Sequence, residues 1–217
     1  MGTLRAWLVA VCLCALGSSA QASEPQPVTY RVTLDVDWSA QTHPLDFPDR
    51  AHLTAIIGAV HHRRYSLFRD GDTASSGLES VAERGRTRLL RAELQEAADR
   101  GRVGSVIKGP HLDAVPGEIV LTVDVTQRHY LVSFVTMLAP SPDWFTGVSV
   151  DLRSSDGWVD RLEVPLLVWD AGTAGGETFY ERTDDTQPRQ SVRISSHPAF
   201  VFADGIKPIG RAIFERQ

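Results

Sequence analysis

The chain has 217 residues, of which 42% are hydrophobic and 23% are charged, and its formal net charge at pH 7 is −5. Its length and apolar content are enough for one substantial core, and all-β sandwiches of this size are common as single domains. The acidic balance argues against a nucleic acid as the partner and favours a divalent cation.

Residues 1–22 have the pattern of a secretory signal peptide. They hold one basic residue, Arg5, an apolar run from Ala6 to Leu16 and a small-residue cleavage site at Ala20 to Ala22. The run is too short to span a membrane, so we predict no transmembrane segment. Both cysteines precede the predicted cleavage site, and the mature chain would therefore contain no disulfide. We expect one domain over residues 23–217, in a secreted or periplasmic protein.

The first half of the mature chain predicts a strand, an ambiguous segment and a helical region. Apolar and polar residues alternate from Tyr30 to Trp38, which is typical of a half-buried strand. The segment from Ala51 to Val60 is ambiguous, and Tyr65 to Phe68 could form a short strand. Apolar residues at helical spacing, ending at glycines, predict one or two short helices within 77–100. We expect these helices to cover a sheet end.

Strand patterns dominate the second half of the chain. Ile119 to Val125 alternates, with Asp124 on the polar side, and Tyr130 to Leu138 is apolar on both faces, as in a central strand. Four more strands are predicted: Phe145–Leu152, Val159–Val168, Ser191–Ser195 and Ile209–Arg216. Turn residues separate these segments, which predicts an all-β fold, an antiparallel β-sandwich of two packed sheets.

Three aspartates in this half are candidate ligands for a metal ion. Asp124 lies in a strand, whereas Asp143 and Asp170 lie where strands give way to loops. Carboxylates that converge on one rim of a sandwich can bind calcium, which takes six to eight oxygen ligands. Each aspartate alone is as readily explained as a turn residue or a solvated strand residue.

Several motifs resemble the spondin N-terminal domain, the module found in F-spondin and mindin. The segments HYLVSF, SPDWFTGVSVDL and WDAGT carry the resemblance, and YRVTLDVDWSAQTHPLDFP, IIGAVHHRRYSLF and TQPR extend it over most of the mature chain. The chain is similar to a bacterial single-domain member of this family. The resemblance implies a β-sandwich related to C2 domains.

The resemblance also implies a calcium site. In the family pattern an acidic residue stands at the position of Asp124, and aspartates stand at the positions of Asp143 and Asp170. A fourth family aspartate is replaced here by Ala174, which predicts a weakened site. Glu177 follows a Gly-Gly pair and is a further candidate ligand, because a flexible backbone could let its side chain reach the ion.

Histidines raise the alternative of a metal-dependent hydrolase, which the residue pattern does not favour. His61 and His62 are adjacent and His129 is near Asp124, but their spacing matches no zinc motif. We expect His61 and His129 to form structural hydrogen bonds. Ser133 has no nucleophile elbow around it. We therefore predict a protein that is not an enzyme.

The sequence as a whole predicts a calcium-binding adhesion or binding module of spondin type. Its partner would be an extracellular protein or glycan. The alternative is a structural cell-envelope protein that keeps the fold and has lost the metal site, as Ala174 would suggest. The arginine set Arg63, Arg64 and Arg69 could contact an acidic partner or form a solvated face.

Overall fold

The structure, a computed structural model, describes residues 26–181 and 184–217. The signal peptide predicted over residues 1–22 lies outside the described residues. Within the described part of the chain, no helix is long and apolar enough to cross a membrane.

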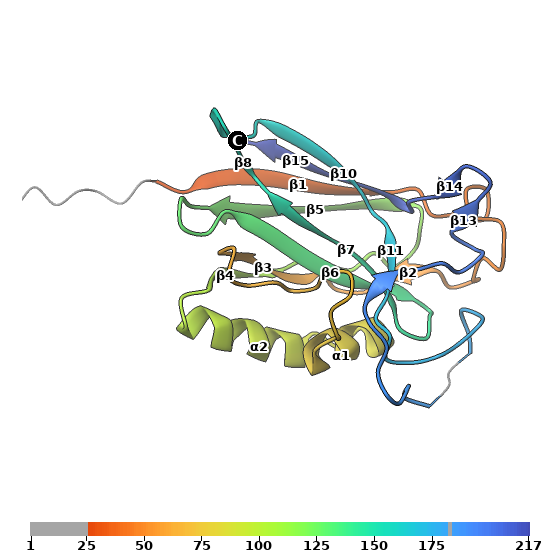
Figure 1. Cartoon of the computed structure of the whole chain (residues 1–217). Helices are drawn as coiled ribbons and strands as arrows, with labels where there is room; N and C mark the ends of the chain where they lie inside the picture. The colour runs from red at the N-terminus through yellow and green to blue at the C-terminus, as the bar shows by residue number, and fades with distance from the viewer. Residues whose placement is uncertain (1–25, 182–183) are drawn as a thin grey trace, which may run out of the picture.

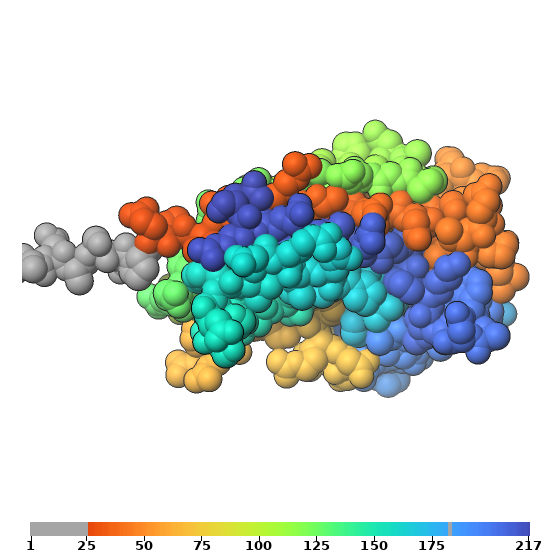
Figure 2. Space-filling model, turned by 90° about the horizontal axis from the view of Figure 1, so that it is seen from above, coloured from red at the N-terminus to blue at the C-terminus, as the bar shows by residue number. Residues whose placement is uncertain are grey.

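One sheet of the protein has four strands and joins the two halves of the chain. In order across the sheet they are β10 (Arg161–Pro165), β15 (Gly210–Arg216), β1 (Val28–Val36) and β5 (Gly117–Val125), and every pair is antiparallel. The N-terminal β1 and C-terminal β15 therefore lie side by side (Figure 2). The alternation that predicts the first strand is confirmed, because the apolar side chains of β1 are buried and the intervening ones are more exposed.

The second sheet has seven strands and contains the segment predicted to be central. Its main path is β12 (Arg193–Ile194), β11 (Val168–Asp170), β7 (Trp144–Asp151), β6 (Leu131–Ala139), β3 (Ile57–His61) and β4 (Val103–Lys108), and β2 (His52–Leu53) pairs with β6. Two small hairpins complete the strands: β8 (Arg153–Ser154) with β9 (Gly157–Trp158), and β13 (Val201–Phe202) with β14 (Gly205–Ile206).

Two helices form a third layer on the outer face of the seven-stranded sheet (Figure 1). Helix α1 (Ser76–Arg84) begins after Ser75, whose hydroxyl accepts a hydrogen bond from the Leu78 N–H at 3.1 Å, and ends at Gly85 with φ of 62°. Helix α2 (Arg88–Asp99) supplies Glu93, which accepts from the Gly77 N–H at 2.7 Å and joins the two helices. The expected helices are present, and they cover part of a sheet face.

Two apolar cores lie between the three layers. The larger core lies between the sheets and includes Trp38, Phe134 and Phe214, all fully buried. The smaller core lies between the seven-stranded sheet and the helices, where Val135 and Phe145 contact the helical layer. Because β6 packs on both faces, eight of its nine residues are buried, as the sequence predicts.

Some predicted strands differ from the structure. The segment predicted as one strand from Val159 to Val168 is divided into β10 and β11, which belong to different sheets. No strand forms over Tyr65 to Phe68, and β4 was not predicted, because its burial does not alternate. The ambiguous segment contributes β2 and β3.

The direction of β6 defines the two ends of the molecule. The β5–β6 turn precedes Leu131 at one end, and the Ser-Pro-Asp turn follows Ala139 at the other. A strand of nine residues spans roughly 25 to 30 Å. Residues just before β6 and residues just after it therefore lie far apart, which decides which carboxylates can meet.

Candidate metal centre

Asp143 lies in the turn between β6 and β7 and is almost completely buried, with 1% of its surface exposed. Its Oδ2 accepts hydrogen bonds from the backbone N–H groups of Thr173 at 2.7 Å and Ala174 at 3.0 Å. Its backbone carbonyl accepts from the Ala171 N–H at 3.2 Å. These contacts fix the carboxylate against the loop that follows β11.

The second carboxylate oxygen of Asp143 lacks a partner in the described part of the chain. Oδ1 is buried and accepts no hydrogen bond from any described residue. Burial and, to a smaller extent, the charges of Asp170 and Glu83 raise the pKa of Asp143 to about 6, against the lowering effect of the hydrogen bonds from Ala174 and Thr173. A carboxylate held in this way binds either a proton or a cation.

Glu83 is a second buried carboxylate, and its charge raises the pKa of Asp143. It lies in the last turn of α1 and is only 7% exposed, and its Oε1 has no partner among the described residues. Its Oε2 is paired with Arg84 at 2.9 Å. An acidic side chain near a helix C-terminus opposes the helix dipole. Arg84 offsets the charge of Glu83, but Oε1 stays buried without a partner among the described residues. This position therefore indicates a role other than helix stability.

Asp170 closes the cluster from the end of β11. Its Oδ1 accepts from the Gly172 N–H at 2.8 Å, forming a turn, and its Oδ2 is paired with Arg193 at 3.1 Å. Its side chain is partly buried, and its charge acts on Asp143. Asp170 is thus both a turn residue and a member of the acidic cluster.

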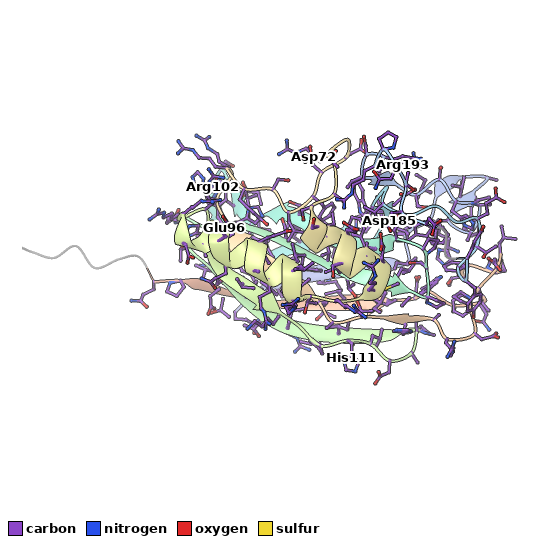
Figure 3. The ribbon with its side chains drawn as sticks, turned by 90° about the horizontal axis from the view of Figure 1, so that it is seen from below. Asp72, Glu96, Arg102, His111, Asp185 and Arg193 are labelled. Carbon is purple, nitrogen blue, oxygen red and sulfur yellow. The ribbon has the colours of Figure 1, made fainter. Side chains whose placement is uncertain are left out.

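Asp185 lies at the same end of the molecule, opposite Ala174. These two residues form an isolated antiparallel β-bridge. Ligand atoms of Asp185, Glu79 and Glu83 all lie within 4.8 Å of one another, and Figure 3 shows Asp185 beside α1. An aspartate from a later segment therefore lies next to the position where the family pattern has its last aspartate.

The donor set of this cluster fits calcium. The acidic cluster has two parts: Glu79, Glu83 and Asp185, whose ligand atoms lie within 4.8 Å of one another, and the neighbouring Asp143 and Asp170. The charge of Glu83 raises the pKa of Asp143, which links the two parts electrostatically. All of the ligand atoms are the oxygens that calcium prefers. The two unpartnered oxygens, on Glu83 and Asp143, are those that a bound cation would satisfy. Arg84, Arg189 and Arg193 each pair with one carboxylate and leave the cluster acidic.

The structure places Asp124 away from this cluster, unlike the other two predicted aspartates. Asp124 is exposed on β5, in the other sheet, and accepts a hydrogen bond from the Thr29 hydroxyl at 2.6 Å. It lies near the start of β6, whereas Asp143 follows the end of β6. A separation on the order of 25 Å excludes Asp124 from any ion that Asp143 binds.

Glu177 also takes no part in the cluster. Its side chain is exposed, and its backbone is held by neighbouring residues, the N–H by Glu181 and the carbonyl by His197. The structure thus brings Asp143 and Asp170 together and places Glu83 and Asp185 at the same end, whereas Asp124 and Glu177 do not join them. The buried face of the Val-Ala-Glu-Arg segment is the sequence signal that could have identified Glu83.

The histidines form hydrogen bonds within the protein. His61 is buried, with Nδ1 at 3.1 Å from the His62 carbonyl and Nε2 at 2.7 Å from the Ser133 hydroxyl. His129 donates from Nε2 to the Gly101 carbonyl at 3.2 Å. Since both ring nitrogens of His61 are engaged, this geometry favours a structural role over metal ligation.

Comparison with known proteins shows which family the chain resembles. The family model described as Spondin_N matches residues 28–202. The chain is 37% identical to spondin-1 of Gallus gallus over 206 residues, which cover 86% of this chain and 25% of that protein. It is 33% identical to spondin-2 of Homo sapiens over 215 residues, covering 93% of this chain and 65% of that protein. The chain thus spans about a quarter of the length of the spondin-1 relatives.

Proposed function

The chain belongs to the spondin N-terminal domain family, and from this membership we propose that it is a secreted or periplasmic calcium-dependent binding module and not an enzyme. The observation that carries the proposal is the pair of unpartnered carboxylate oxygens on Glu83 and Asp143, both buried in one acidic cluster. Two such charges are unfavourable together without a cation.

Calcium would be held by Glu83 and Asp143, with Asp170 and Asp185 at the edge of the site. These residues come from α1, the β6–β7 turn, β11 and the segment around 185. A bound ion would neutralise the cluster and hold these elements together. The loops at this end of the sandwich would then present a fixed surface to an extracellular protein or a glycan.

Calorimetric titration of residues 23–217 with calcium tests the site, with magnesium as the competing ion. We expect a dissociation constant on the order of 0.1 to 1 mM, as in extracellular calcium modules. At a hundredfold excess, calcium stabilises the folded state by about 2.7 kcal/mol. For a chain of this length the midpoint of thermal unfolding rises by about 5 to 10 °C.

Three variants distinguish the structural ligand set from the set predicted by sequence. Glu83→Gln and Asp143→Asn should each abolish the calcium-dependent rise, and Asp124→Asn should leave it unchanged. Loss of the rise in Asp124→Asn alone would overturn the cluster. If calcium neither binds nor stabilises the unaltered protein, the alternative of a structural envelope protein without a metal ion is favoured.

The binding role needs its own measurement. The protein, with and without calcium, is applied to an array of glycans and to intact bacterial and animal cell surfaces. Retention that needs calcium and is lost in Asp143→Asn supports a calcium-dependent module. Retention that is equal in chelator assigns the binding to another face.

A further inference from the structure

A cluster of arginines surrounds a concavity at the end of the molecule opposite the acidic cluster. The cavity has a volume of about 580 Å³, and its lining includes Arg63, Arg64, Arg100, Arg102, Arg128 and His62. The five arginines, here called the arginine cluster, are all exposed. Figure 3 shows Arg102 beyond the end of α2, far from Asp185.

Three chain segments bring these arginines together. Arg63 and Arg64 follow β3, Arg100 and Arg102 flank the turn between α2 and β4, and Arg128 lies in the β5–β6 turn. Since these positions are distant in sequence, the cluster is a product of the fold. It includes two of the three arginines that the sequence singles out; Arg69 lines a different cavity.

Hydrogen bonds fix the three segments relative to one another. The His62 N–H donates to the Arg102 carbonyl at 2.8 Å, which joins the end of β3 to the α2–β4 turn. His129 Nε2 donates to the Gly101 carbonyl at 3.2 Å, which joins the β5–β6 turn to the same place. The arginines therefore extend from a backbone that is already ordered.

Most of the positive charge in this cluster is not neutralised by the protein. Among the described residues, Arg100 pairs with Glu96, but Arg63, Arg64, Arg102 and Arg128 form no ion pair. This contrasts with the net charge of −5 on the chain. Partial burial and then the charges of Arg64 and Arg63 lower the pKa of His62, as expected beside unneutralised positive charge.

Guanidinium groups arranged around a cavity select for oxyanions. Each planar fork donates two parallel hydrogen bonds to a phosphate or sulfate group. The cavity volume of about 580 Å³ lies within the range of small-ligand sites. A concave site built from turns fits a compact polyanion better than a flat membrane surface.

We propose that the arginine cluster binds a saccharide that carries two or more phosphate or sulfate groups, either free or as the headgroup of a lipid. The site lies at the opposite end of the sandwich from the acidic cluster. Binding here is therefore independent of calcium and of the proposed metal centre.

The test measures binding of the protein, residues 23–217, to sulfated oligosaccharides of increasing length and to inositol hexakisphosphate, by calorimetry at physiological salt. The variant Arg64→Gln/Arg102→Gln/Arg128→Gln removes three unpaired charges from the cluster. The matched control Arg31→Gln/Arg88→Gln/Arg91→Gln removes three exposed arginines elsewhere and has the same net charge. Thermal unfolding confirms that both variants are folded.

We expect the cluster variant to lose affinity by about tenfold or more, since charge-assisted hydrogen bonds are lost, and the control to stay within about twofold. Equal losses in both variants would show that only net charge matters and would overturn the proposal. Absence of binding to either probe would also overturn it.

Two further arms separate the sources of the anion and the two ends of the molecule. Vesicles of phosphatidylcholine with phosphatidylglycerol present anionic phosphates without a saccharide polyanion, and preferential binding to them would assign the cluster to membranes instead. All titrations are repeated in chelator and in calcium. Equal affinity in both supports an independent site, whereas binding that needs calcium contradicts it.

Discussion

The two ends of the helical layer carry opposite charge, and they differ in how far that charge is removed from water. At one end, Glu83 and Asp143 are buried, and each has one carboxylate oxygen without a partner among the described residues. At the other end, four arginines form no ion pair within 26–181 and 184–217, but they are exposed. An unpaired charge is expensive when buried and nearly free when solvated. Ion binding at the acidic end should therefore change the free energy of unfolding. Ion binding at the arginine end should change only the affinity for ligands.

The largest effect is expected for Asp143→Asn, measured by thermal unfolding in chelator at neutral pH. Raising the pKa of Asp143 from the ordinary aspartate value of 3.8 to about 6 corresponds to about 3 kcal/mol of unfavourable charge burial. The neutral amide removes this penalty, so the calcium-free variant should unfold about 6 to 12 °C higher than the unaltered protein. In saturating calcium the order should reverse. A variant that is less stable in both conditions would mean that Asp143 is a structural hydrogen-bond acceptor alone.

The pH dependence of the calcium-free protein sharpens the same comparison. Because the folded-state pKa of Asp143 is raised, its stability contribution is greatest below about pH 4 and is lost as the pH rises through about 6. The difference in unfolding free energy between the unaltered protein and Asp143→Asn should therefore change by about 2 to 3 kcal/mol over this window. Denaturant unfolding at several pH values measures it. A flat difference would contradict the burial of an ionised Asp143.

Arg189→Gln tests how the acidic end is held together. The Arg189 guanidinium donates to the Ala74 carbonyl at 3.1 Å and is paired with Glu79, so it fastens the segment around 185 to the helical layer. Loss of this partly buried pair should lower stability by about 1 kcal/mol and weaken calcium binding through Asp185. Calorimetry and unfolding measure the two effects. Arg193→Gln, whose partner Asp170 is also a candidate ligand, serves as the comparison.

The smallest effect on stability is expected at the arginine cluster. Arg64→Gln/Arg102→Gln/Arg128→Gln should change the unfolding free energy by less than about 0.5 kcal/mol per site, because exposed unpaired charges interact with water. The same variant should lose most of its affinity for polyanions. A marked loss of stability would show that these side chains have a structural role.

Most of the fold could be predicted from the sequence, because local patterns reflect it. Alternation in β1 and β5, the continuous apolar run of β6 and the helical spacing within 77–100 all correspond to observed elements. The strand predicted over Val159–Val168 was wrong in its extent, because the chain passes from one sheet to the other between β10 and β11. Which strand each segment pairs with is not visible in the local sequence pattern.

The candidate site was predicted only in part. Asp143 and Asp170 are linked by adjacent strands, so strand-end patterns identified both. Asp124 is closer to Asp143 in sequence than Glu83 is, yet β6 carries the chain to the other end of the molecule between them. Glu83 reaches the cluster because α1 packs on the sheet, a contact between distant segments.

The sequence by itself determined the β-sandwich class, through hydrophobic periodicity, and the family, through its motifs. It also placed Asp143 and Asp170 at strand ends, since turn motifs are properties of short segments. Only the tertiary structure decided which carboxylates meet, that Asp185 lies beside Ala174, and that the arginines after β3, after α2 and before β6 surround one cavity. Those outcomes depend on strand order and on helix packing. Both are set by burial of the whole chain, and no single segment encodes them.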